Sequence, residues 1–67
     1  MVILSSDKSH AVNTAQVCYY KVCEAGTDYA LRAYFEKDSV LLAKGARRYL
    51  LNLIEEIAQE KDIYMEL

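Results

Sequence analysis

The fold is decided most clearly by residues 46–61, ARRYLLNLIEEIAQEK, which carry the strongest periodic pattern in the chain. At 100° per residue, one side of a helix over this stretch is apolar and the opposite side is polar and charged. The pattern therefore predicts an amphipathic helix that covers a core with one face. That face consists of Ala46, Leu50, Leu53, Ile54 and Ile57, flanked by Leu51 and Ala58.

Upstream of this helix, residues 29–36 alternate with the period of two that is typical of a strand with one buried side. Residues 37–39 predict a polar turn, residues 40–44 complete a hairpin, and Gly45 marks the passage to the helix. One face of the first strand carries Tyr29, Leu31, Ala33 and Phe35, and the other carries Ala30, Arg32, Tyr34 and Glu36.

The N-terminal half also favours strands. Residues 2–4 predict a short strand stopped by a polar turn at residues 5–9. Residues 11–24 are rich in β-branched and aromatic side chains, with an interruption expected at Asn13-Thr14. Gly26 supplies the positive φ of a tight connection. At the other end of the chain, residues 62–67 either extend the helix or dock elsewhere.

These elements predict a single α+β domain over residues 1–67, with a small antiparallel sheet of three or four strands covered on one face by one C-terminal helix. The alternative is a three-helix bundle, because the chain has suitable N-cap residues and two glycines that suit helix C-termini. Residues 10–24 have apolar side chains at helical spacing as well, so their pattern leaves strand and helix open. The alternation over residues 29–36 favours strands.

Length and composition narrow the class of protein. A chain of 67 residues has room for one core, and a core of this size supplies only about 3–5 kcal/mol, so we expect a homodimer or higher homo-oligomer. The composition is 54% hydrophobic and 27% charged, which is typical of a globular domain. The net charge of −2 argues against nucleic acid as a partner. No signal peptide or membrane span is indicated, which predicts a cytoplasmic location.

No constellation of residues points to catalysis, a metal or a cofactor. The single histidine, His10, lies in an expected turn, where we expect a solvent-exposed side chain and not a catalytic base. Cys18 and Cys23 are expected on opposite faces of a strand, as reduced and buried thiols, and they leave a metal site short of ligands. Gly26 and Gly45 are isolated, so no phosphate-binding loop is present.

Arg47 and Arg48 stand in the first turn of the expected helix, and Glu60 stands near its end. This order opposes the helix dipole and costs about 0.3–1 kcal/mol per charge at an exposed site. The two guanidinium groups add to the free N–H donors of the helix N-terminus, and together they favour an anion. We therefore name Arg47 and Arg48 as candidate binding residues.

The six tyrosines suggest a second binding surface, because tyrosine combines a large apolar area with a polar tip. A single helix covers only one face of a sheet, so the other face is left for a partner. Arg32 and Tyr34 are expected on that uncovered face. The candidate binding residues of the sheet are Arg32, Tyr34 and Tyr20.

In the order of its segments the chain resembles a group of small bacterial and phage proteins. The resemblance is carried by Val-Ile-Leu-Ser-Ser-Asp (2–7), Ala-Val-Asn-Thr (11–14), Tyr-Ala-Leu-Arg-Ala-Tyr-Phe (29–35) and Val-Leu-Leu-Ala-Lys (40–44), followed by a helix. It implies a β-hairpin followed by a C-terminal helix, and it implies no activity. The Gly-Ala-Arg-Arg start of the helix departs from the acidic, capped start that we expect.

Two functions are expected from these features. The first is a non-enzymatic protein–protein interaction module, with a phage- or prophage-encoded inhibitor of a host protein as its specific form. The alternative is a small-ligand-binding protein, acting as a homo-oligomer, that holds a phosphate or nucleotide with Arg47, Arg48 and tyrosines. An enzyme or a nucleic-acid binder would need a site that only an oligomer assembles.

Overall fold

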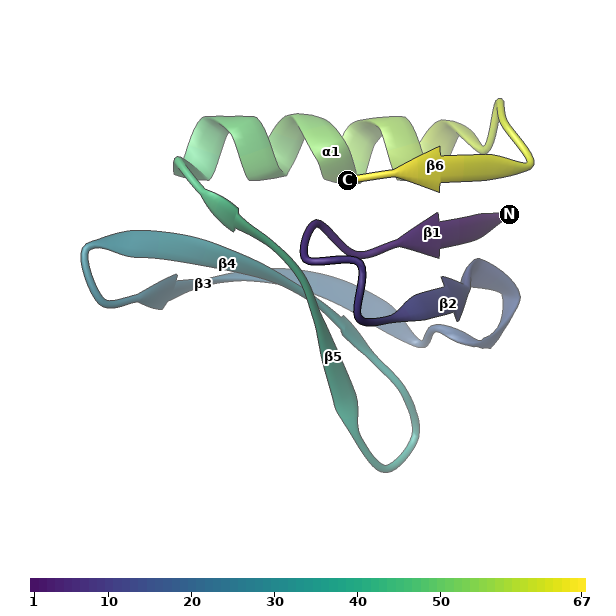
Figure 1. The fold of residues 1–67 in the computed structure, drawn as a ribbon, viewed down its shortest axis with the longest axis horizontal. Coiled ribbons are helices and arrows are strands. Elements are labelled where there is room, and N and C mark those ends of the chain that lie inside the picture. Colours follow the sequence, from purple (N-terminus) through teal and green to yellow (C-terminus); the bar gives the residue numbers. More distant parts are fainter.

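The computed structural model describes residues 1–67 and confirms the α+β class. One helix and six strands are present, and the strands form two three-stranded sheets, β2-β1-β6 and β3-β4-β5 (Figure 1). The prediction of one sheet is therefore wrong in this respect. In chain order the elements are β1 (Val2–Leu4), β2 (Ala11–Asn13), a 3₁₀ turn (Thr14–Gln16), β3 (Tyr19–Ala25), β4 (Asp28–Tyr34), β5 (Ser39–Gly45), α1 (Arg47–Gln59) and β6 (Tyr64–Glu66).

The larger sheet is an antiparallel meander with β4 at its centre. A tight turn joins β3 to β4, and Gly26 adopts φ +67° there, as its position in the sequence predicts. The pairing of β4 with β5 is irregular between Leu31 and Arg32, which fits one extra residue into β5. Leu31 and Ala33 are fully buried on one face of β4, in agreement with the alternation of residues 29–36.

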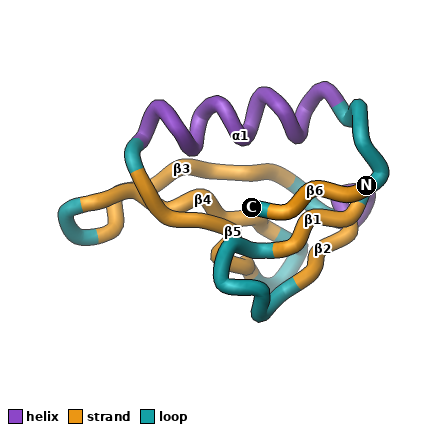
Figure 2. The backbone as a smooth tube through the Cα atoms, turned by 45° about the horizontal axis from the view of Figure 1, so that its top comes forward, coloured by secondary structure: helices purple, strands orange, loops and turns teal.

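The core lies on that face of the larger sheet. Helix α1 contributes the buried residues Leu50, Leu53 and Ile57, and the small sheet contributes Ile3 and Val12. Figure 2 shows α1 lying over the larger sheet, with the small sheet beside it. The helix and the small sheet thus cover the same face, and no element of the chain covers the other face.

The small sheet contains the one strand that the sequence did not predict. Strand β6 pairs in parallel with β1, which places Met65 beside Ile3. Backbone bonds at both ends complete the pairing, from Val2 N to Ile63 O at 3.0 Å and from Leu67 N to Leu4 O at 3.0 Å. The tail therefore docks on β1, one of the two outcomes that its apolar residues allow.

Helix α1 runs from Arg47 to Gln59, close to the predicted range of 46–61. The N-cap, Ala46, is exposed and makes no side-chain hydrogen bond, and the helix ends at Glu60 in the left-handed conformation. Since α1 is the single α-helix, the three-helix alternative is wrong. Residues 10–24, which the sequence left open, form β2, the 3₁₀ turn and β3.

Candidate functional site

The uncovered face of the larger sheet brings two tyrosines and several basic side chains together. Residues paired across two strands share a face of the sheet. Leu31 and Ala33 point into the core, so the alternate residues of β4 and their partners point away from it. We call this surface the outer face, and it consists of Tyr19, Lys21, Cys23, Ala30, Arg32, Tyr34, Ser39, Leu41 and Lys44.

A stacked pair of tyrosines lies at one end of the outer face. The rings of Tyr19 and Tyr34 have centroids 4.7 Å apart and planes inclined by 6°. The Cys23 Sγ lies 4.0 Å from the Tyr34 Oη, and this contact raises the pKa of the Tyr34 hydroxyl. Tyr19 keeps 55% of its surface exposed. The pair therefore presents a large, ordered aromatic surface to solvent.

Next to the stack, the outer face brings like charges together. Lys21 lies directly opposite Arg32 in the pairing of β3 with β4. The Arg32 Nε and Nη2 donate to the Ser39 Oγ at 3.2 and 3.0 Å, which holds the guanidinium in place. The single ion pair of the chain joins Lys8 and Glu66 elsewhere. Lys21 and Arg32 thus have no carboxylate partner within the chain.

Tyr20, a residue predicted to join Arg32 and Tyr34, lies on the other face. It pairs with Ala33, so its side chain points toward the core. The Tyr20 Oη is buried without a hydrogen-bond partner, and this burial, together with nearby Glu60, raises the pKa of the hydroxyl. The tyrosine that does meet Tyr34 is the adjacent Tyr19, which the sequence reasoning missed.

Arg47 and Arg48 form a separate site. Both are exposed in the first turn of α1, where no acidic residue accompanies them. They line a shallow hollow of about 230 Å³ together with Leu51, Asn52 and Glu55. Neither arginine belongs to the outer face. The five predicted binding residues are therefore divided between the outer face, the core side of the sheet and the start of α1.

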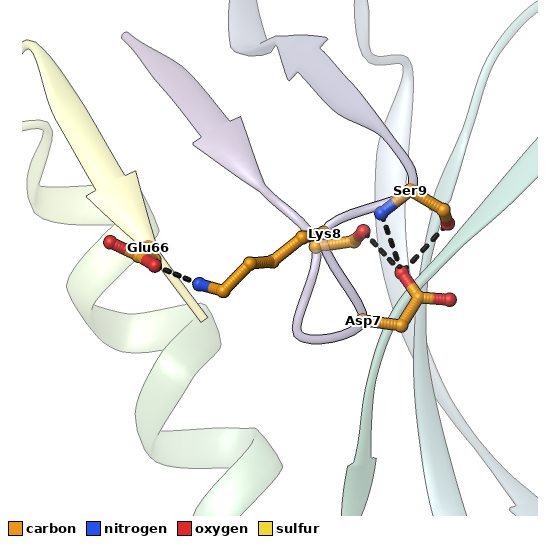
Figure 3. A network of polar contacts seen from close by, with 5 residues as sticks. Asp7, Lys8, Ser9 and Glu66 are labelled. Carbon is orange, nitrogen blue, oxygen red and sulfur yellow. Dashed lines mark hydrogen bonds and ion pairs between the residues drawn. The ribbon is translucent and has the colours of Figure 1, made fainter.

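The turn between β1 and β2 holds the most extensive polar network (Figure 3). One oxygen of Asp7 accepts hydrogen bonds from the Ser5 Oγ at 2.7 Å, the Ser9 N at 3.0 Å and the Ser9 Oγ at 2.7 Å. These bonds lower the pKa of the Asp7 carboxyl to about 2. Lys8, in the left-handed conformation at φ +62°, forms the ion pair with Glu66. The network fixes the turn and ties it to β6.

His10 also contacts this network, through its Nδ1 at 2.8 Å from the Ser9 Oγ. The arrangement differs from a catalytic triad, because the acid there contacts the histidine, whereas Asp7 contacts the serine. His10 is exposed, as expected for a residue in a turn. We therefore interpret these contacts as part of the turn.

The two cysteines are free, and the prediction that both are buried is wrong, because Cys18 is exposed and Cys23 is only half-buried. Cys18 is exposed because it precedes β3, where the strand geometry assumed for it has not begun. No group of three or more histidine, cysteine or acidic residues is arranged to hold a metal ion. The one helix lacks the length and apolar character needed to cross a membrane.

No protein-family model, curated protein or solved structure matches the chain. Its function must therefore be argued from the geometry of the outer face and of the helix start.

Proposed function

We propose that the chain is a non-enzymatic protein-interaction module whose outer face binds an acidic surface of another protein. The observation that carries this proposal is the pairing of Lys21 with Arg32. Like charges directly opposite each other destabilise a sheet. A carboxylate of a partner placed beside both cations removes this repulsion and adds two attractive contacts. The unfavourable pair is thus compensated in the complex.

The tyrosine stack supports the same surface. Tyrosine and arginine are enriched among the residues that contribute most to binding energy in protein interfaces. Tyr19 and Tyr34 form a rigid stack, and Ser39 fixes the guanidinium of Arg32, so little side-chain freedom remains to be lost on binding. The outer face therefore combines apolar area with positive charge that is already in position.

A protein fits this surface better than a nucleic acid does. Tyr19 and Tyr34 line a shallow hollow of about 350 Å³ that also contains Glu36 and Asp38 from the turn after β4. Bases stacked on the tyrosines would bring their phosphates close to these carboxylates. The net charge of −2 adds to this repulsion. A folded partner, in contrast, presents acidic and neutral groups in separate places.

A module of this kind acts by occupying a surface of its target. The role of a phage- or prophage-encoded inhibitor of a host protein belongs to this proposal, with a target in the cytoplasm, where free thiols such as Cys18 and Cys23 persist. The ability to block a surface requires no catalytic group.

Affinity capture from host lysate with three forms of the protein tests the proposal. The double variant Lys21→Glu/Arg32→Glu should lose the proteins that the wild-type chain captures. Its matched control, Arg47→Glu/Arg48→Glu, changes the net charge equally at the start of α1 and should capture them as before. Loss of capture in the control, or its persistence in the outer-face variant, would contradict the proposal.

A second candidate function is favoured by one observation, the uncapped start of α1 with its two arginines. Free N–H donors and guanidinium groups at this position suit a phosphate, and subunits meeting here would complete the site. Inorganic phosphate or ATP should then raise the Tm of the wild-type chain and of Lys21→Glu/Arg32→Glu, but not of Arg47→Glu/Arg48→Glu. An equal effect on all three proteins would exclude this candidate.

A further inference from the structure

Strand β3 forms a long, regular edge of the larger sheet. It pairs with β4 over all seven of its residues without a bulge, and nothing pairs with its other side. Apart from the ladder with β4, no backbone hydrogen bond of the turns, loops or caps involves residues 19–25. In an antiparallel strand every second residue directs its N–H and C=O away from the neighbour. The free side of β3 therefore carries unpaired donors and acceptors.

The other three sheet edges are protected. Strand β5 contains the irregular position, and the Ser6 N donates to the Leu42 O at 2.8 Å, so the β1–β2 turn covers part of this edge. Strands β2 and β6 have only three residues each. Short strands, irregularities and covering loops are the usual means by which proteins prevent edge pairing. Strand β3 has none of these three features and no proline, and its only protective residues are the charged Lys21 and Glu24.

We propose that two copies of the chain associate through β3, which pairs antiparallel with β3 of the second copy about a two-fold axis at Val22. The two larger sheets then form one continuous six-stranded sheet. In this register Lys21 lies opposite Cys23 of the second copy, so no like charges meet. Pairing centred one residue earlier would place Lys21 against itself, which is unfavourable. The charge of Lys21 thus disfavours that alternative register.

The same register brings a carboxylate toward the Tyr20 hydroxyl, which is unpaired in the single chain. It brings the exposed carboxylate of Glu24 of the second copy to the position opposite Tyr20 on the inner face. The Tyr20 Oη has no hydrogen-bond partner in the single chain. Buried hydroxyl groups in proteins are normally paired, and a rotation of the Tyr20 side chain toward the β3 edge on association would let this covered hydroxyl donate to Glu24.

Helix α1 adds apolar surface to this interface. Figure 2 shows α1 running along β3. Glu56 lines a hollow with Met65, so this side of α1 faces the small sheet. At 3.6 residues per turn, Leu51, Ile54 and Ala58 lie roughly opposite Glu56 and face the β3 edge. Leu51 and Ile54 are only half-buried in the single chain. Two helices related by the two-fold axis would bury these side chains against each other.

Sedimentation velocity measures the association at protein concentrations of about 1–200 µM. This range suits an interface near the lower size limit of about 1,000 Å². We expect a monomer–dimer equilibrium. Cys23→Lys places two like-charge pairs in the interface and should weaken the dimer about tenfold. Leu41→Lys adds the same charge to the outer face of β5, away from the interface, and should leave the dissociation constant unchanged. A monomer at every concentration, or equal effects of both variants, would overturn the proposal.

A cross-linking experiment tests the register in the intact chain. In a Cys18→Ser background, Lys21→Cys places a new thiol opposite Cys23 of the second copy, within the reach of a disulfide. Oxidised glutathione should then convert most of the protein to a covalent dimer. Leu41→Cys in the same background should remain monomeric on denaturing gels. Rapid cross-linking of both variants, or of neither, would refute pairing through β3 in this register. The absence of cross-linking in both variants is also the result expected if β3 pairs with a strand of another protein.

Discussion

Lys21→Glu is expected to stabilise the free protein while it abolishes binding to an acidic partner. Lys21 lies directly opposite Arg32, and charged cross-strand pairs contribute about 0.2–1 kcal/mol in either direction, according to their signs. The substitution reverses the sign of the pair, so the free energy of unfolding should rise by about 0.4–2 kcal/mol. Each 1 kcal/mol raises the Tm of a domain of this length by about 4–8 °C.

Urea unfolding at two salt concentrations measures this effect. The protein concentration must be low and constant, because self-association also adds stability. Salt screens both signs of interaction, so it should stabilise the wild-type chain and destabilise Lys21→Glu. The matched control is Lys44→Glu, which changes the same charge on the same face opposite the uncharged Ala30. This control should change the free energy of unfolding by no more than about 0.5 kcal/mol.

The result that would refute the reasoning is equal stabilisation by Lys21→Glu and Lys44→Glu. In that case net charge, and not the pair, would be responsible. Persistence of the effect in an Arg32→Gln background would lead to the same conclusion, because the pair no longer exists there.

Three further predictions concern the core, one backbone position and the Asp7 carboxyl. Leu50→Ala, at a fully buried site, should lower the free energy of unfolding by about 2–5 kcal/mol and leave the chain largely unfolded. The control is Ile63→Ala, at a side chain that is 90% exposed, and its urea midpoint should equal that of the wild-type chain. Equal midpoints for Leu50→Ala and Ile63→Ala would contradict the assigned core. Gly45→Ala should lower the free energy of unfolding by about 1–3 kcal/mol, because φ at this position is +155° and the added Cβ would lie 3.2 Å from the Tyr49 ring. An unchanged free energy of unfolding would exclude this strain. Since the folded pKa of Asp7, about 2, lies below the usual 3.8, its contribution is complete above about pH 4 and is lost toward pH 2. The stability difference between wild type and Asp7→Asn should shrink in that window, and an NMR titration with a midpoint near 3.8 would contradict the lowered pKa.

The elements that the sequence predicted correctly are those with local signals. The apolar stripe of α1 and the alternation of β4 each repeat within a few residues, and both lead to buried side chains at Leu50 and Leu31. Strand β6 has no such signal. It exists because Met65 lies beside Ile3, at the other end of the chain, and a pattern within three residues does not identify a distant partner. The division into two sheets depends on the same distant pairing.

The candidate site was predicted in part. The prediction chose the wrong one of two adjacent tyrosines in β3, so the chosen side chain lies on the wrong face of the sheet. Two adjacent tyrosines, Tyr19 and Tyr20, point to opposite faces, and composition does not distinguish them. The sequence did contain the necessary signal in the turn at Gly26. Counting outward from the pair Ala25 and Asp28 that closes this turn places Tyr19 opposite Tyr34. The same count places Lys21 opposite Arg32.

The pairing of β1 with β6 has a consequence for the order in which the chain folds. The hairpins of the larger sheet and α1 form from neighbouring segments, whereas β1 meets β6 only after almost the whole chain has been brought together. The small sheet is therefore expected to form last. In native-state hydrogen exchange, its amides should open locally and exchange early, while those of β4 should exchange only when the whole domain unfolds.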